Sequence, residues 1–158
     1  MIFLRKIVKE DMDIIFQWSN DSEVRKWSFS KDPISYEDHK AWFKKKMIDK
    51  NSLIWILIHN NKPSGLVRLE RKSFSAVINY LIAPHARGQN LGSKMLRLAI
   101  KESHNEWNGI DIIAYTIPQN IASNKSLIKA GFTLDELSKN KNKNLYFIKQ
   151  TMDSKNEN

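Results

Sequence analysis

Residues 80–96, which read YLIAPHARGQNLGSKML, contain the arrangement that decides the fold of this chain. An apolar strand ends, a polar turn with Gly88 follows, and an amphipathic helix begins at once. This order directs unpaired backbone N–H groups and the positive end of the helix toward one place, where a phosphate can bind. Gly88 and Gly92 allow close approach to the backbone, and Asn90 belongs to a residue type that tolerates a positive φ. The segment predicts a phosphate-binding turn, although an ordinary helix cap would use glycines in the same way.

Outside this segment, apolar periodicity predicts one mixed α/β domain over residues 1–150. Strands are expected over residues 2–7, 53–59, 66–70, 76–82, 110–115, 132–134 and 145–148. Helices are expected over residues 10–18, 22–27, 35–49, 91–103 and 121–130. Asp21 or Ser22 is expected to cap the second helix, and Ser35 the third. Residues 60–65 are expected to form a turn, and residues 151–158 a frayed tail.

The composition excludes several classes of protein. The chain has 158 residues and no cysteine, which excludes disulfides, a cysteine nucleophile and thiolate metal ligands. No run approaches the roughly 20 apolar residues of a membrane span, and a signal-peptide pattern is missing, so we expect a soluble cytoplasmic protein that does not enter membranes. The 26 Lys and Arg against 17 Asp and Glu give a net charge of +9, but the positive residues are scattered and mostly Lys. A nucleic-acid surface would use more Arg, so no nucleic-acid partner is expected.

The segment Arg87–Gly92 resembles the Arg/Gln-x-x-Gly-x-Gly/Ala motif of the GNAT acyl-CoA N-acyltransferases. In that family the motif joins the fourth strand to the next helix and holds the pyrophosphate of coenzyme A. Asn90 stands where the family usually has Gly, and a side chain carries a cost in a left-handed turn. The P-loop and dinucleotide-binding motifs do not match, because neither glycine pattern follows the strand.

A second segment, Asn120–Phe132, is similar to the family's Asn-x-x-Ser…Lys-x-Gly-Phe pattern. Asn120 and Ser123 fall at the start of a helix next to a strand end, where an amide can bond to a pantetheine-like ligand. An N-cap and a first-turn hydroxyl are the structural alternatives for these two residues. Two motifs in the right order identify nearly the whole chain as GNAT-like.

The resemblance implies a mixed, mostly antiparallel sheet of six to seven strands, splayed between the fourth and fifth strands and flanked by about four helices. It implies acetyl-CoA as co-substrate in the gap between these strands, and no metal. Backbone groups near Leu81 would pair with the pantetheine arm as an added strand would. The residues that the resemblance assigns to acetyl-CoA binding are Leu81, Ile82, Ala83, Arg87, Gly88, Gln89, Asn90, Leu91, Gly92, Ser93, Asn120, Ser123 and Lys125.

The resemblance also implies direct attack of a neutral amine on the thioester, without an acyl-enzyme. Many members place a Tyr four residues after the Ser of the second motif, as the acid toward the leaving thiolate, and this chain has Leu127 there. The acid is then Tyr115, Tyr80 or water. Glu70, at a strand end, and His39, on the helix before the core sheet, are the candidates for the base. A surface or structural role is the alternative for each of them.

The acceptor side is expected in residues 16–25 and 34–43, which combine aromatic and polar side chains. They resemble a subgroup that acetylates amino-sugar nucleotides in pseudaminic-acid and similar surface-glycan pathways. A base or sugar could stack on an aromatic ring and Arg25 could meet a diphosphate, although core packing is the alternative for the tryptophans. The acceptor-side candidates are Trp18, Asn20, Arg25, His39, Trp42 and Asn79. The preferred acceptor is therefore a nucleotide-linked amino sugar.

Two other functions stay open. A peptide N-terminus, as in the ribosomal-protein alanine acetyltransferases, would favour an acidic groove, and the net charge of +9 argues against it. A non-catalytic CoA- or RNA-binding module is less consistent with the intact Arg87, Gly88, Gly92 and Asn120, and the chain lacks the aromatic and basic runs of RNA-binding sheets. A homodimer is also left open.

Overall fold

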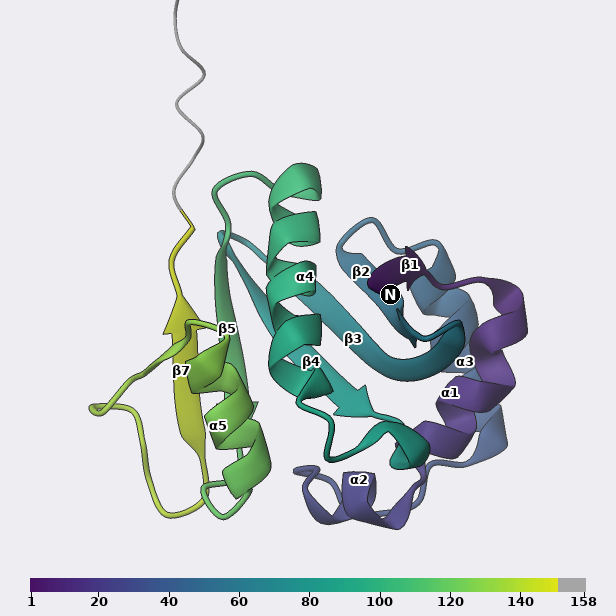
Figure 1. The fold of residues 1–158 in the computed structure, drawn as a ribbon, viewed down its shortest axis with the longest axis horizontal. Coiled ribbons are helices and arrows are strands. Elements are labelled where there is room, and N and C mark those ends of the chain that lie inside the picture. The colour runs from purple at the N-terminus through teal and green to yellow at the C-terminus, as the bar shows by residue number, and fades with distance from the viewer. Residues whose placement is uncertain (151–158) are drawn as a thin grey trace, which may run out of the picture.

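The computed structural model describes residues 1–150, and the predicted tail at 151–158 lies outside the described residues. Seven strands form one sheet in the order β1-β2-β3-β4-β5-β7-β6 (Figure 1). The strands are β1 (Ile2–Lys6), β2 (Ser52–His59), β3 (Lys62–Lys72), β4 (Ser75–Ile82), β5 (Asp111–Thr116), β6 (Thr133–Leu134) and β7 (Asn144–Ile148). The predicted order of strands and helices along the chain is confirmed.

The sheet is antiparallel except between β4 and β5, which run parallel. These two strands pair only from Ser75 to Val77 on one side and from Asp111 to Ile113 on the other. Beyond Val77 the remaining five residues of β4 have no partner on that side, so the sheet opens toward the carboxyl ends of both strands. The expected splay between the fourth and fifth strands is confirmed.

Within residues 1–150, five α-helices flank the sheet, as the periodicity predicted and one more than the family resemblance implied: α1 (Met12–Ser19), α2 (Ser22–Lys26), α3 (Tyr36–Met47), α4 (Leu91–Glu106) and α5 (Ile121–Lys129). Two 3-10 turns, Lys9–Asp11 and Pro84–Ala86, precede α1 and follow β4. Figure 1 shows α4 in front of β3 and β4, α5 in front of β5 and β7, and α2 beside the end of β4. No helix among residues 1–150 combines the length and apolar character that a membrane crossing requires.

The core lies on both faces of the central strands, since residues 54–58 of β2 are all buried. Met95, Leu96 and Ala99 of α4 are completely buried. Helices α1 and α3 contribute Ile15 and Phe43 to the same core. Apolar burial on this scale is what keeps the two halves of a splayed sheet together.

The local signals for turns and caps were accurate, with one exception. Asp21 caps α2 and Ser35 caps α3 through their side-chain oxygens. The predicted turn over 60–65 is wrong, because β3 already begins at Lys62. Asn60 and Asn61 both adopt a positive φ, of 50° and 64°, and two such residues suffice for a tight hairpin.

Candidate active site

A cleft of about 890 Å³ opens where β4 and β5 separate. Its floor is formed by residues 78–82 of β4 and 114–116 of β5. The starts of α4 and α5 line one side, and residues from α2 and the loop after it line the other. The cleft therefore has one wall that contains both sequence motifs, and a second wall from the N-terminal part of the chain. We call them the motif wall and the α2 wall.

The turn before α4 has the backbone conformation that the sequence predicted. Gly88 has a φ of 75°, and Asn90 adopts the left-handed conformation with a φ of 59° and a ψ of 24°. Asn90 is the N-cap of α4, and its side chain makes no capping hydrogen bond. The first N–H groups of α4 thus have no side-chain acceptor and lie beside the cleft, where an anionic group can meet them. Gln89 is exposed and does not line the cleft.

Gly92 has a packing role that the sequence did not indicate. A Cβ atom at this position would lie 2.9 Å from Ser126 Oγ and 3.8 Å from Tyr80 Cε2. The glycine therefore allows α4 to approach α5 closely, in addition to lining the cleft. A large side chain here would push the helices apart, so a Gly92 variant does not report on ligand binding alone.

Arg87 connects the turn to α2. Its Nη2 lies 2.6 Å from Asp21 Oδ2, and Asp21 is the residue that caps α2. The hydrogen bond from Arg87 holds the pKa of Asp21 below its usual value. The guanidinium lies at the edge of the cleft with this carboxylate as its partner.

On the other helix of the motif wall, Asn120 caps α5 by accepting a hydrogen bond from the Ser123 N–H at 3.2 Å. The hydroxyl groups of Ser123 and Tyr80 lie 2.7 Å apart. Burial raises the pKa of Tyr80 above its ordinary 10.0, although hydrogen bonds from serine hydroxyls oppose the rise. Lys125 also lines the cleft, and Leu127 is a fully buried part of the same wall. Tyr80 therefore presents a protonated hydroxyl near the position where the family's acid is missing.

The remaining predicted residues of this wall differ in their position relative to the cleft. Leu81, Ile82, Leu91 and Ser93 line it, whereas Ala83 is buried and does not. Tyr115 lines the cleft from β5, with the Lys143 ammonium 4.6 Å from its ring centre.

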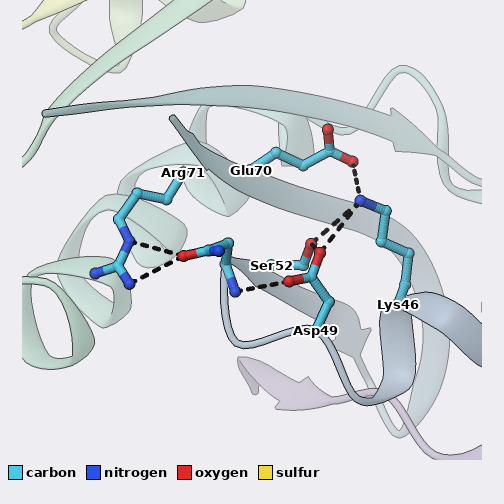
Figure 2. Close-up of polar contacts among 6 residues, drawn as sticks. Lys46, Asp49, Ser52, Glu70 and Arg71 are labelled. Atoms are coloured by element: carbon cyan, nitrogen blue, oxygen red, sulfur yellow. Dashed lines mark hydrogen bonds and ion pairs between the residues drawn. The ribbon is translucent and has the colours of Figure 1, made fainter. Parts of the chain in front are cut away.

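Neither residue named as a base lines the cleft. His39 is only 3% exposed, its Nε2 lies 2.7 Å from the Met12 carbonyl oxygen, and aromatic rings surround it. Glu70 is opposite Val77, where β4 is still bonded to β5, and its Oε1 lies 3.1 Å from Lys46 Nζ. Figure 2 shows Lys46 between Glu70 and Asp49. Both groups have structural partners at a distance from the opened strands.

The predicted acceptor residues divide in the same way. Trp18 is 6% exposed in the core, and the Asn20 side chain is bonded to the backbone of Ile34. Arg25 borders the cleft, but its guanidinium donates to the carbonyl oxygens of Ser19, Ser30 and Asp32. These bonds fix the loop after α2 and leave few donors for a ligand.

Asn79 is exposed and lines the cleft, while Trp42 stands behind Arg68 and does not line it. Of the six acceptor-side candidates, the structure therefore brings only Asn79 and Arg25 to the cleft.

The predicted site residues leave out part of the cleft lining, including Glu23, Trp27, Phe29 and Arg68. Trp27 and Phe29 belong to the stretch Trp27–Ser30, where aromatic and serine residues alternate without helical spacing. Phe29 is 56% exposed and lines the cleft. An aromatic residue in a polar, non-periodic segment is the signal that could have found them. Arg68 gave no such signal, because an alternating strand has polar residues on its solvent face.

The charge of the cleft is strongly biased. Five basic residues line it against one acidic residue, Glu23; the basic residues are Arg25, Arg68, Arg87, Lys125 and Lys129. Within residues 1–150, no group of three or more His, Asp and Glu side chains is placed to hold a metal ion. A long cleft with a left-handed turn, free helix N–H groups and basic side chains fits a ligand with a phosphorylated end, as acetyl-CoA has.

Comparison with solved structures shows the same fold. Spermidine N-acetyltransferase from Vibrio cholerae, solved with CoA and spermine, superposes with a TM-score of 0.82 at 19% identity, over 94% of this chain and 95% of that one. Aminoglycoside acetyltransferase AAC(6')-Ib, solved with coenzyme A, gives 0.79 at 17% identity, over 95% of both chains. A domain from Methanocaldococcus jannaschii gives 0.81 at 23% identity, over 94% and 98%. No curated protein sequence matches the chain.

The sequence supplies the family. The model of the acetyltransferase (GNAT) domain matches residues 2–133, which is most of the chain. Both sequence motifs lie within this match and line one wall of the cleft. The chain therefore belongs to the GNAT acetyltransferases, whose co-substrate is acetyl-CoA.

Proposed function

We propose that this enzyme transfers the acetyl group of acetyl-CoA to the amine of a nucleotide-linked amino sugar. The observation that carries the proposal is the charge of the cleft, where five basic side chains face a single carboxylate. Acetyl-CoA accounts for part of this charge at the motif wall. The charge of Arg68, on β3, is not needed for acetyl-CoA and would be available to bind the acceptor.

On the motif wall, the N–H groups at the start of α4 and the Arg87 guanidinium would hold the pyrophosphate. The unpaired edge of β4 at Leu81 and Ile82 would bond to the pantetheine arm, because these residues have no strand beside them on the β5 side. Ser123 and Lys125 would contact the ligand from the start of α5.

The chemistry requires a neutral amine and a proton for the departing thiolate. Tyr80 is our candidate for the acid, since its hydroxyl lies at the motif wall and burial keeps it protonated. The amine would lose its proton to water in the cleft, which Glu23 borders as the one carboxylate. His39 and Glu70 are bonded elsewhere and have no part in this proposal.

The charge of the cleft indicates which class of acceptor it favours. Spermine and aminoglycosides, the ligands of the structural neighbours, are polycations, which need carboxylates around them. A peptide with a basic tail would need the same. This cleft has the opposite bias and favours an acceptor with a negative group. Trp27 and Phe29 at the α2 wall give an aromatic surface on which a nucleobase can stack.

The test is release of CoA thiol from acetyl-CoA with a panel of amines. The panel contains UDP-linked 4-amino sugars, the same sugars without the nucleotide, spermidine, kanamycin and N-terminal peptides. We expect the UDP-linked amines to show a kcat/KM at least about tenfold above that of every cation. Preferred turnover of spermidine or kanamycin would contradict the amino-sugar nucleotide. Turnover of peptides alone would identify an N-terminal acetyltransferase.

A further inference from the structure

Arg68 is the one charged residue of the cleft that neither sequence motif nor the packing of the α2 wall explains. It lies in the middle of β3, opposite Asn79 of β4, and both residues line the cleft. Directly opposed residues of neighbouring strands project from the same face of the sheet. Asn79 is three residues before the end of β4, so Arg68 lies about 10 Å along the strand from where the phosphate-binding turn begins.

One flat face of the Arg68 guanidinium packs on an aromatic ring, and the N–H groups at its edge have no protein acceptor within residues 1–150. Its central carbon lies 5.1 Å from the centre of the Trp42 ring, a cation–π contact. Trp42 in turn stacks on the buried His39 ring, with 5.7 Å between the ring centres, so the support is rigid. Stacking uses the flat face of a guanidinium and leaves its N–H fork available to a carboxylate or phosphate.

Within residues 1–150 no hydrogen bond or ion pair satisfies that fork. The nearest carboxylate on the same strand face, Glu70, is 3.1 Å from Lys46 and is occupied by it. No fully buried side-chain nitrogen lacks a partner in this part of the chain, so the unpaired Arg68 nitrogens must reach solvent. Burial lowers the pKa of Arg68 while Glu70 opposes the shift. A half-buried cation without an anion gains most from a ligand that supplies one.

We propose that Arg68, supported by Trp42 and flanked by Asn79, binds an anionic group of the acceptor and selects for it. This inference rests on the proposed function, in which the anionic group is the diphosphate of the nucleotide. It replaces Arg25, whose donors are used by backbone carbonyls, as the residue that meets the diphosphate. Arg68 is then a specificity-determining residue, separate by about 10 Å from the turn after β4 that is proposed to hold the acetyl-CoA phosphates.

The binding test uses UDP and uridine as probes, by calorimetry on the enzyme saturated with CoA. Wild type should bind UDP more tightly than uridine, because only UDP carries the anion. Arg68→Gln should weaken UDP binding by about tenfold or more and leave uridine and acetyl-CoA binding unchanged. Arg68→Lys keeps the positive charge but lacks the paired N–H donors of the guanidinium. Its affinity for UDP should therefore lie between that of wild type and that of Arg68→Gln. Equal UDP affinity in wild type and Arg68→Gln, or no UDP binding by wild type, would overturn the proposal.

Arg71→Gln is the matched control, since Arg71 is on the same strand but bonds to Asn51 and stacks on Trp107 outside the cleft. It should leave UDP binding unchanged. Thermal unfolding of each variant shows that it is folded.

A kinetic experiment distinguishes the proposed function from the proposed anion site at Arg68. With a UDP-linked amine, Arg68→Gln should raise the acceptor KM by about tenfold with little change in the KM of acetyl-CoA. If no amino sugar is turned over, the proposed function fails, and Arg68-dependent UDP binding would still support the anion site.

Discussion

Arg68 and Glu70 lie two residues apart on the same face of β3, and their surroundings are opposite. Glu70 is at the closed end of the sheet, where β4 still pairs with β5, and it forms part of a network with Lys46, Asp49 and Ser52. Arg68 faces the open end and has no anionic partner within residues 1–150. A paired charge stabilises the fold or does little, whereas an unpaired charge beside a cleft is available to a ligand. We therefore expect variants at the open end to change kinetics and variants elsewhere to change stability.

The largest effect is expected from Tyr80→Phe, which removes the proposed acid from the open end. The kcat should fall by about 100-fold, with little change in the KM of acetyl-CoA. Since burial raises the pKa of Tyr80, any loss of kcat that its deprotonation causes in wild type should occur at a higher pH than for an ordinary phenol. Steady-state kinetics across pH measures both effects.

Tyr115→Phe is the control for this variant, because Tyr115 also lines the cleft but lies on β5. A larger drop in kcat for Tyr115→Phe than for Tyr80→Phe would transfer the acid role to Tyr115.

Asp11→Asn tests a paired charge far from the open end. Asp11 is 6% exposed and accepts two hydrogen bonds from Arg5, at 2.7 and 2.8 Å, and one from the Val8 N–H. Losing the charge should lower the free energy of unfolding by about 2–3 kcal/mol at pH 7 and leave kcat unchanged. Urea denaturation measures the first and the thiol assay the second.

The pH dependence of this pair has a definite sign. Burial alone would raise the pKa of Asp11, but the hydrogen bonds from Arg5 and Val8 bring it below 3.8 in the folded protein. The stabilisation is therefore complete above the unfolded pKa and is lost as the pH falls through the folded one. The difference between wild type and Asp11→Asn should shrink below about pH 4; a constant difference down to pH 2 would contradict this account.

Arg87→Gln should weaken acetyl-CoA binding by about tenfold, as measured by calorimetry, because it removes one charged contact to the pyrophosphate. Asp21→Asn sharpens the comparison, since it converts a paired arginine into an unpaired one. Freed from the carboxylate, Arg87 should bind acetyl-CoA up to about fivefold more tightly. Weaker binding in Asp21→Asn would show that the ion pair holds Arg87 in its binding position.

The smallest effect is expected from Glu70→Gln at the closed end. Its ion pair with Lys46 is partly exposed, with side chains 27% and 14% accessible, so the loss of stability should be below about 1 kcal/mol. The kcat/KM should stay within about twofold of wild type. A tenfold fall in kcat, with unchanged stability, would restore Glu70 as a candidate base.

Local sequence signals predicted the turn before α4 and the helix caps. The left-handed Asn90, the caps at Asp21 and Ser35, and the cap of α5 by Asn120 depend on residues within a few positions of each other. Such features are decided by backbone sterics and nearby hydrogen bonds, which the sequence contains directly. The length predicted for the turn at Asn60 was wrong because two asparagines make a shorter turn than the six-residue polar segment suggested.

The partners of the predicted catalytic and acceptor residues were decided by contacts outside the local motifs, and here the sequence was a weaker guide. His39, Arg25 and Glu70 have the side-chain chemistry of catalysis and binding, but their partners come from residues 5 to 27 positions away, or from another helix. In the sequence, Arg68 looks like any polar residue on the solvent face of a strand. Only its position beside the Trp42 ring in the folded structure distinguishes it.

The sequence by itself determined the family, the order of the elements and the left-handed turn before α4, because each depends on local patterns. Which charges stay unpaired was decided only by the tertiary structure. The pairing of a side chain depends on what a distant segment places beside it, and folding makes that choice for all residues at once.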